Sequence, residues 1–139
     1  MKVYAYLHPQ LNILCCAVLP EAVPQDVQAI EFEVEDISDV IYDGTQIRLK
    51  TPEEKLNEQK QEKLQQLKQI FASKIAQTDY ILVKIEEARL LNQDIQPLLE
   101  KYATQLQERQ RLRERYEELK QAIQNTTNLE ELNAIVIDL

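Results

Sequence analysis

The residues that could do chemistry are few and stand apart in the sequence. The only histidine, His8, precedes Pro9 in a turn-like segment, so a catalytic triad or a histidine metal site lacks its other members. Cys15 and Cys16 are adjacent, and a strand would point their side chains to opposite faces. This spacing indicates neither a disulfide nor a metal site. We therefore predict no catalytic residue, no cofactor-binding residue and no metal ligand.

Charged residues gather on one segment that should be helical. Its arginines stand at every second position and glutamates interleave with them: Arg109, Arg111, Arg113, Arg115, Glu108, Glu114, Glu117 and Glu118. On a helix such a spacing spreads around the axis, so the pattern indicates a solvated, salt-bridged face rather than a phosphate site. The chain also has pairs of adjacent glutamates. No further acidic residue is placed by the sequence to share a catalytic site with any of these pairs. We expect a protein that is not an enzyme and needs no cofactor.

Composition and charge narrow the classes of partner. The chain has 139 residues, a net charge of −8 and 44% hydrophobic residues, which suits one small domain, or a module with a helical extension. A DNA or RNA binder needs a basic surface, so the charge disfavours nucleic acid. No segment reaches the ~20 apolar residues of a membrane span. The apolar run 11–19 resembles a short signal-peptide core, but no cleavage motif follows it. We expect neither nucleic acid nor a membrane as a partner.

The first 50 residues have the pattern of a small β module. Residues 2–7 and 12–19 are apolar, β-prone runs with a turn-like break between them. In residues 30–35 apolar side chains alternate with glutamates, which is typical of a strand with one face in water. Those glutamates would serve solubility and edge protection. We expect a small antiparallel meander.

Two short motifs mark the end of this module and the start of a long helix. Asp43-Gly44 stands between two β-prone runs, which is a strong hairpin signal and predicts a positive φ at Gly44 in a tight turn. Thr51, Pro52 and Glu54 then have the types expected of an N-cap, a first helical residue and the third position of a capping box. We expect a helix to begin at this point.

The segment from residue 51 to residue 125 contains no glycine and only two prolines, and most of its residues are good helix formers. An apolar stripe begins at Leu64, is interrupted at residues 78–79 and resumes with Ile81, Leu82, Ile85 and Ala88. After a polar break at residues 92–94, a second helix has a regular 3-4 spacing that is mostly apolar or aromatic: Ile95, Leu98, Tyr102, Gln105, Arg109, Leu112, Tyr116, Leu119 and Ile123. Such a spacing is typical of a coiled-coil-like seam.

A tight turn at residues 92–94 would fold the two helices into an antiparallel hairpin. With that turn at the centre, the numbers of facing residues sum to about 187. Tyr116 then falls opposite Phe71, so apolar residues meet apolar residues along the seam. The alternative is that the seam pairs between chains, which would make the protein a self-associating coiled-coil scaffold.

Arg109 is a polar residue in the middle of this seam. The same sum places it opposite Thr78, next to Asp79. Because an unpaired buried charge costs several kcal/mol, we predict that Arg109 and Asp79 form a structural polar layer that fixes the register. Otherwise Arg109 would extend to water over the neighbouring turn.

The C-terminal residues predict a short helix and an apolar tail. Thr127 and Glu130 form a second capping-box pair in front of a helix over residues 129–134. Residues 135–139 are apolar enough for a strand or a docking tail. Because the seam is used inside the hairpin, the candidates for contact with a partner or a homo-oligomer are the remaining apolar residues: Leu56, Ile135, Val136, Ile137 and Leu139. The alternative is that the tail packs on the β module.

The fold class that follows is α+β. We expect a small antiparallel β module over residues 1–50, a long helical hairpin over residues 51–126, and a short helix with an apolar tail over residues 127–139.

The order of these parts, with several short motifs, resembles a known group of proteins. The motifs are a "YDG" hairpin within residues 39–49, a charged helix that opens with Thr-Pro-Glu-Glu at residue 51, a "TDY" segment within residues 75–88, a "Y…L…R…LR" helix over residues 102–113, and a "T-x-EEL" ending at residues 126–132. Together they are similar to small tail-associated proteins of tailed bacteriophages, which include tail-fibre assembly chaperones.

The resemblance implies a non-enzymatic protein of the phage tail module whose partner is a tail or tail-fibre protein. It also implies a place in the host cytoplasm during assembly, or in the tail of the virion. The chain lacks the proline-rich linker and the tryptophans that are frequent in the chaperone type. Whether it acts as a chaperone or stays in the tail as an adaptor therefore remains open at this stage.

Overall fold

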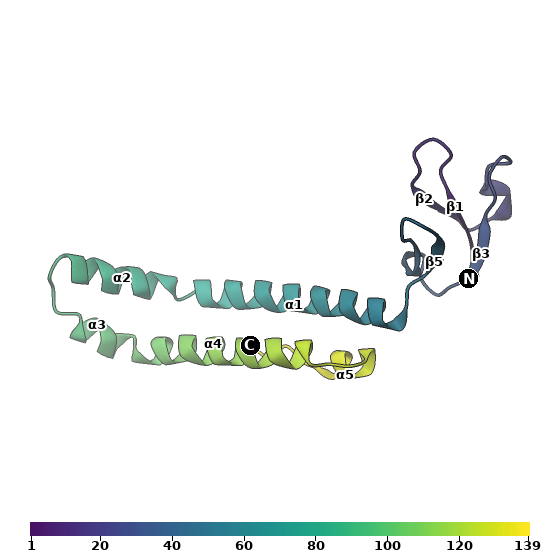
Figure 1. Ribbon diagram of the computed structural model, residues 1–139. Coiled ribbons are helices and arrows are strands. Elements are labelled where there is room, and N and C mark those ends of the chain that lie inside the picture. Colours follow the sequence, from purple (N-terminus) through teal and green to yellow (C-terminus); the bar gives the residue numbers. More distant parts are fainter. The chain divides into compact units, whose positions relative to one another are not determined.

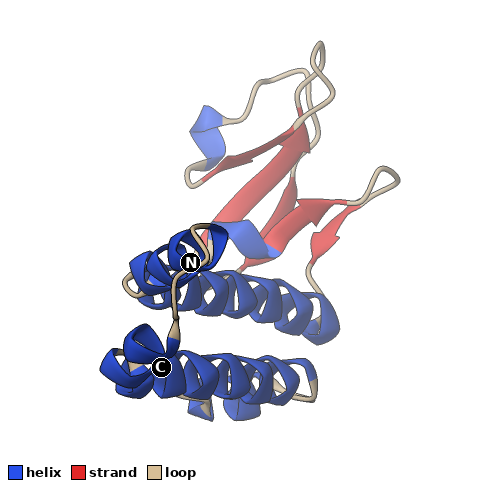
Figure 2. Ribbon diagram, turned by 90° about the vertical axis from the view of Figure 1, so that its left-hand side faces the viewer, coloured by secondary structure: helices blue, strands red, loops and turns tan.

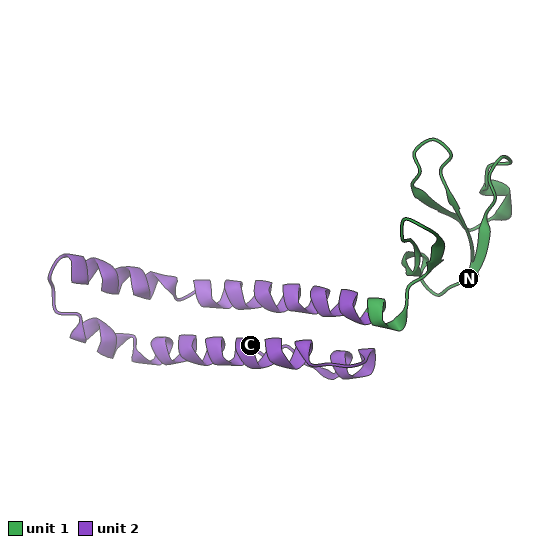
Figure 3. Ribbon diagram, in the orientation of Figure 1, with its two compact units in different colours: residues 1–55 green, residues 56–139 purple.

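The computed structural model describes residues 1–139, and the chain forms two compact units, Met1–Lys55 and Leu56–Leu139 (Figure 3). The first unit holds the strands and the second is helical, so the fold is α+β, as the sequence predicts (Figures 1 and 2). No helix is both long enough and apolar enough to cross a membrane.

A three-stranded antiparallel sheet forms most of the first unit. Its strands are β1 (Lys2–Leu7), β2 (Leu14–Ala17) and β3 (Ile30–Glu33), in the order β2-β1-β3. The predicted meander is therefore wrong in its order, since β3 pairs with β1 and not with β2. The long connection after β2, which includes a 3-10 turn at Pro20–Ala22, carries the chain to the other edge of the sheet. Strand β1 lies in the centre of this sheet, and its Val3 and Ala5 are fully buried there.

A separate two-stranded sheet closes the unit. Its strands are β4 (Val40–Tyr42), which follows a 3-10 turn at Ile37–Asp39, and β5 (Ile47–Leu49). Gly44 has a φ of 90°, which confirms the predicted positive value. However, the closing pair is Tyr42–Ile47, so the loop has more than the two residues of a primed turn. The carboxylate of Asp43 stabilises this loop by accepting hydrogen bonds from the amides of Thr45 (2.9 Å) and Gln46 (2.8 Å).

The apolar core of the first unit lies between these sheets. It contains four buried residues and four partly buried ones: Val3, Ala5, Val34, Val40, Leu14, Cys16, Phe32 and Ile47. The glutamates that alternate with Phe32 and Val34 are exposed, as the period-2 pattern predicts.

Helix α1 (Pro52–Ala76) begins with the predicted capping box. The Thr51 hydroxyl accepts a hydrogen bond from the Glu54 amide at 3.2 Å, and the Glu54 carboxylate accepts one from the Thr51 amide at 3.0 Å. Both amides would otherwise lack a partner inside the helix.

The second unit is an antiparallel helical hairpin. Helices α1 and α2 (Asp79–Leu90) form one arm, and α3 (Gln96–Lys101) and α4 (Ala103–Gln124) form the other (Figure 1). The Phe71 and Tyr116 rings stack with their centroids 4.5 Å apart, and Tyr102 is buried with Ile81 and Ile85. These contacts confirm the predicted pairing, and they lie within one chain.

Each arm is two helices and not the one long helix that was predicted. The first arm breaks between Ala76 and Asp79, and the second breaks where the backbone leaves the helical region at Tyr102 (φ −106°, ψ 17°). The turn between the arms contains Asn92 at a φ of 56°, a left-handed conformation that asparagine tolerates better than most residues.

The C-terminal helix α5 (Leu129–Ala134) has the predicted bounds but a different cap. The Asn128 side chain accepts a hydrogen bond from the Glu131 amide at 2.8 Å, and the Glu131 carboxylate accepts one from the Thr127 amide at 2.8 Å. The predicted Thr127–Glu130 pair is therefore replaced by a pair one residue later. The reason is that Asn128 has the extended backbone of an N-cap residue (φ −150°, ψ 167°).

The tail after α5 forms no strand and packs on the helices of its own unit. Ile135, Ile137 and Leu139 lie against the apolar cluster of α1, α4 and α5. Asp138 forms an ion pair with Arg115 on α4 at 2.8 Å, and Lys74 on α1 donates a hydrogen bond to the Leu139 carbonyl. The tail could have docked on a partner, judged from the sequence, but it packs on its own chain instead.

The capping box yields a first test. We expect Thr51→Ala to lower the free energy of unfolding by about 1 kcal/mol, because it removes the acceptor for the Glu54 amide. Thr51→Ser keeps that acceptor and should stay close to the wild type. Urea denaturation followed by circular dichroism measures both variants. Equal midpoints for Thr51→Ala and the wild type would mean that this cap does not stabilise α1.

Candidate functional site

The polar layer of the hairpin is built around Arg109. This side chain is buried, with 4% of the residue exposed, and its Nη1 donates to the Ile75 carbonyl at 2.9 Å, to Thr78 Oγ1 at 2.8 Å and to Asp79 Oδ1 at 2.9 Å. The predicted proximity of Arg109 and Asp79 is confirmed. The alternative, in which Arg109 extends to water, does not occur.

The position of this layer explains its chemistry. Ile75 lies in the last turn of α1, and its carbonyl accepts hydrogen bonds from the Thr78 amide and the Thr78 hydroxyl, both at 3.2 Å, as well as from Arg109. Asp79 opens α2, where a carboxylate is favoured by the partial positive charge of a helix start. Arg109 Nε is buried with no hydrogen-bond partner, so the layer is not fully satisfied. The Asp79 carboxylate is half exposed, and the layer joins α4 to the end of α1 and the start of α2.

The residues expected to meet a partner are mostly used within the chain. Leu56 is buried in a cluster with Leu67, Leu119, Ile123 and Leu132, and the side chains of the tail pack against that cluster. Among the five candidates only Val136 is well exposed, at 71%. Leu56 is buried because α5 turns back and covers the polar start of α1. This fold-back was not predicted from the sequence.

The outer face of α2 is the apolar surface that the second unit leaves open. We use this name for the side of α2 that faces away from the buried Ile81, Ile85 and Ala88; its residues are Leu82, Val83, Glu86, Glu87, Leu90 and Leu91. Val83 and Leu90 are 64% and 73% exposed. Five of the six residues line a shallow hollow of about 510 Å³. Leu82 was predicted to belong to the inner stripe, but it lies on the outer face and is 41% exposed.

Charge on this face is acidic and partly unpaired. Glu86 lies 3.7 Å from Arg89, at the long end of the range for an ion pair, and Glu87 has no ion-pair partner in the structure. The two carboxylates stand between the apolar pairs Leu82–Val83 and Leu90–Leu91. A matching surface would therefore place a basic group between two apolar anchors.

A signal for this face was present in the sequence. An amphipathic helix keeps its apolar residues on one stripe. In α2 the buried stripe is Ile81, Ile85 and Ala88, whereas Leu82, Val83 and Leu90 stand at positions off that stripe. These three residues therefore have to face outward.

A cluster of charges lies in the first unit around Arg48. Its Nε is 2.9 Å from Asp43 Oδ2 and its Nη1 is 2.6 Å from Glu54 Oε1. The Arg48 side chain and the Thr51 amide lower the pKa of Glu54 to about 2. Hydrogen bonds from the Gln46 amide and from Arg48 lower the pKa of Asp43 to about 2 as well. Carboxylates that stay ionised at neutral pH are unsuited to general acid catalysis, so this cluster joins the β4–β5 loop to the start of α1.

The histidine and the two cysteines lie in and beside the turn between β1 and β2. His8 Nδ1 accepts hydrogen bonds from the amides of Gln10 (3.2 Å) and Leu11 (3.1 Å), which closes the turn between β1 and β2. Cys15 and Cys16 are free thiols. Burial raises the pKa of the Cys16 thiol, which lowers its fraction of reactive thiolate. No group of three or more histidine, cysteine or acidic side chains is arranged to hold a metal ion.

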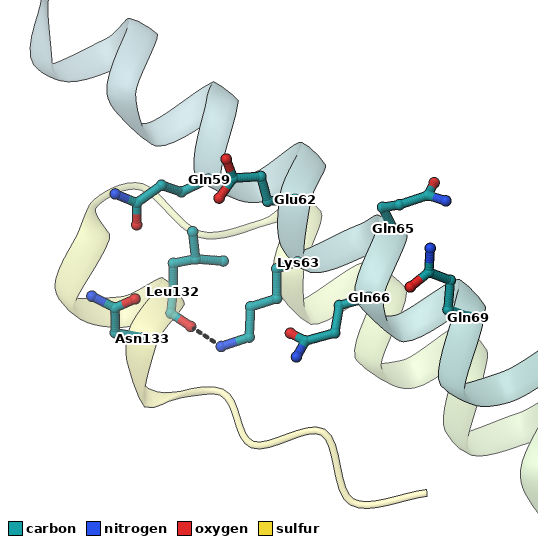
Figure 4. A pocket seen from close by; sticks show the side chains of 8 residues that line it. All are labelled: Gln59, Glu62, Lys63, Gln65, Gln66, Gln69, Leu132 and Asn133. Atoms are coloured by element: carbon teal, nitrogen blue, oxygen red, sulfur yellow. Dashed lines mark hydrogen bonds between the residues drawn. The ribbon is translucent and has the colours of Figure 1, made fainter. Parts of the chain in front are cut away.

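A polar groove of about 580 Å³ lies between α1 and α5 (Figure 4). Amide side chains dominate its lining, which consists of Gln59, Glu62, Lys63, Gln65, Gln66, Gln69, Leu132 and Asn133. The Lys63 ammonium donates to the Leu132 carbonyl at 2.8 Å across this groove. This hydrogen bond across the groove supports the docking of α5 on α1.

Comparisons with known proteins found no matching protein-family model, no matching curated protein and no matching solved structure. Of the surfaces described above, the outer face of α2 has the features of a binding surface, since it exposes large apolar side chains beside two carboxylates.

The Arg48 cluster predicts how the first unit responds to acid. Both carboxyl pKa values lie below their ordinary values of 3.8 and 4.5 in the folded chain, so the stability they contribute is present above those values. It should be lost as the pH falls from about 5 to about 2. In Arg48→Met, carboxyl NMR titration should show the pKa of Glu54 rising more than that of Asp43, which keeps its backbone donors. Arg89→Met, which removes an arginine paired within the second unit, should leave both titrations unchanged; an unchanged Glu54 in Arg48→Met would contradict the assignment.

The polar layer predicts the cost of truncating Arg109. We expect Arg109→Ala to lower the free energy of unfolding by about 3 kcal/mol, because it leaves a cavity and removes the hydrogen bonds that join α4 to the end of α1 and the start of α2. Arg109→Met should cost less, since it fills the space without burying a charge. The matched control is Arg113→Ala on the exposed side of α4, with an expected change within about 0.5 kcal/mol. Urea denaturation measures all three, and equal effects of the two alanine variants would show that the layer does not stabilise the hairpin.

Proposed function

We propose that this chain is a non-enzymatic interaction protein of a bacteriophage tail module, which either assists the assembly of a tail fibre or remains in the tail as an adaptor. The observation that carries the proposal is the outer face of α2, a set of large apolar side chains left open on an otherwise polar hairpin. Apolar patches of this kind on a folded protein commonly mark a contact with another protein.

The hairpin gives this face a rigid support. Ile81 and Ile85 anchor α2 from the inside, and the Arg109 layer fixes its start. A partner that packs against α2 therefore meets a surface that is already ordered, which lowers the entropic cost of binding. Helix-to-helix packing or a helix laid in a groove are the contact modes that suit such a surface.

The acidic pair defines what the partner should carry. Glu86 and Glu87 lie between apolar pairs, so a fitting partner presents apolar anchors on either side of a lysine or arginine. Segments of a fibre that are exposed before assembly could provide this pattern.

The phage assignment draws its support from the order of parts and the short motifs described from the sequence. It places the protein in the host cytoplasm during assembly, and in the virion if it acts as an adaptor. A self-associating coiled-coil scaffold unrelated to phage has less support, because the seam that it would need between chains pairs within one chain.

Co-expression with the fibre protein encoded beside this chain tests the proposal. We expect the fibre to be soluble only when this chain is present if it acts as a chaperone, and we expect the chain in purified particles if it acts as an adaptor. In the double variant Val83→Lys, Leu90→Lys, we expect at least a fivefold reduction in the yield of soluble fibre if the chain is a chaperone. If it is an adaptor, we expect the same reduction in the amount of this chain found in purified particles.

The matched control adds two lysines to exposed positions of the other arm, Thr104→Lys with Gln107→Lys. Circular dichroism should show that both double variants keep their helix content. A fibre whose solubility is indifferent to this chain, together with particles that lack the chain, would reject the proposal.

A further inference from the structure

Strand β2 lies at an edge of its sheet, and one side of its backbone has no partner. It pairs with β1 alone. The His8 amide donates to the Ile13 carbonyl at 2.8 Å, so Ile13 directs its backbone groups toward β1. Backbone groups alternate in direction along a strand, so Cys15 and Ala17 also face β1, while Leu14 and Cys16 point their amides and carbonyls outward.

The two edges of this sheet are protected very differently. At the other edge, β3 carries Glu31 and Glu33, whose exposed carboxylates pair with Lys2 (3.2 Å) and the N-terminal ammonium (3.0 Å). Charged side chains of this kind discourage pairing with another strand. Residues 11–19, which contain β2, have no charged side chain at all.

The same run exposes large apolar side chains on both sides of β2. Leu11, Ile13, Val18 and Leu19 are between 53% and 65% exposed. An edge strand that offers unpaired backbone groups and apolar flanks is a template for strand addition. The occupant should be extended, and it should be uncharged where it faces this run.

We propose that β2 pairs with β2 of a second copy of this chain, antiparallel about a two-fold axis, so that two three-stranded sheets become one. The run itself meets the requirements for the occupant. The chain has a net charge of −8, yet no like charges face each other if the run pairs with itself. A partner selected by charge would need a charged group in this edge, and there is none.

The direction of the free backbone groups fixes the register. If Leu14 lies opposite Cys16 of the second copy, the two residues exchange amide-to-carbonyl hydrogen bonds, and the same holds for Cys16 opposite Leu14 of the second copy. All the outward amides and carbonyls of β2 are then paired. Cys15 then lies opposite Cys15 of the second copy, in a position where no hydrogen bonds join the two residues. Such pairs have Cα atoms ~4.5 Å apart, within the range of a disulfide. Residues 11–19 are centred on Cys15, so their apolar side chains also meet across the axis.

This inference stands apart from the proposed function, which concerns the outer face of α2. The pairing uses a short strand, so we expect a dimer that dissociates on dilution and not a permanent one.

Disulfide trapping with single-cysteine variants tests the register. The oxidant is diamide, which accepts the two electrons and two protons released when two thiols join. Cys16→Ser, which keeps Cys15, should form a covalent dimer at least tenfold faster than Cys15→Ser, which keeps Cys16. Equal rates, or a faster reaction of Cys15→Ser, would overturn the proposed register.

Sedimentation equilibrium of the reduced chain tests the pairing itself. Ile13→Lys places a charge at the free edge and should weaken dimerisation at least tenfold. Ile30→Lys places the same charge on the guarded edge strand, at a residue of similar exposure, and should change little. A chain that is monomeric at all concentrations overturns the proposal, and so does a dimer that Ile13→Lys leaves intact.

Val83→Lys with Leu90→Lys serves as a second control in the same measurement. Loss of the dimer in that variant, with Ile13→Lys unaffected, would assign self-association to the outer face of α2 instead.

Discussion

The antiparallel seam between the two helical arms is the contact on which the second unit depends, and Arg109 is the residue that fixes its register. Apolar pairs such as Phe71 with Tyr116 could be exchanged for other apolar pairs if one arm moved by a turn. The guanidinium of Arg109 could not, because its three acceptors occur together only where α1 ends and α2 begins. A shifted register would bury an arginine without a partner, at a cost of several kcal/mol.

This register also decides which side of α2 remains in water. Once Ile81 and Ile85 are held inside, Leu82, Val83 and Leu90 have to face outward, because a helix presents one stripe to each neighbour. The two ends of the hairpin are then treated differently. At the end near Leu56, α5 and the C-terminal tail supply extra apolar cover. No further element follows at the other end to cover α2.

Local features of this fold were predictable from the sequence, and features that depend on distant parts of the chain were not. The capping box at Thr51, the positive φ of Gly44 and the pairing of the arms were predictable, because each depends on neighbouring residues or on one turn. The strand order was not, since the choice of β3 between two edges of β1 depends on a connection with little pattern of its own. The burial of Leu56 was missed for a similar reason: its cover comes from α5, which lies more than 70 positions later.

The same limit applies to the candidate site. Arg109 and Asp79 could be paired by counting, because both lie on a regular hairpin. The outer face of α2 was missed because Leu82 was assigned to the inner stripe and Val83 and Leu90, which lie off that stripe, were not considered. The free edge of β2 required the strand order itself, since a meander would have placed β2 between two neighbours and left no edge there.

The two proposed surfaces belong to different units, and this has a consequence for binding. A dimer formed through β2 would carry two outer faces of α2, one from each copy. Attachment of the first face to a fibre or tail protein that repeats the same surface would raise the effective concentration of the second face near its target, provided that the connection between the units spans the distance. Weak contacts at each α2 could then add up to stable attachment, and they would release together on dilution of the dimer. Neither surface needs a large buried area of its own for such an arrangement to hold a partner.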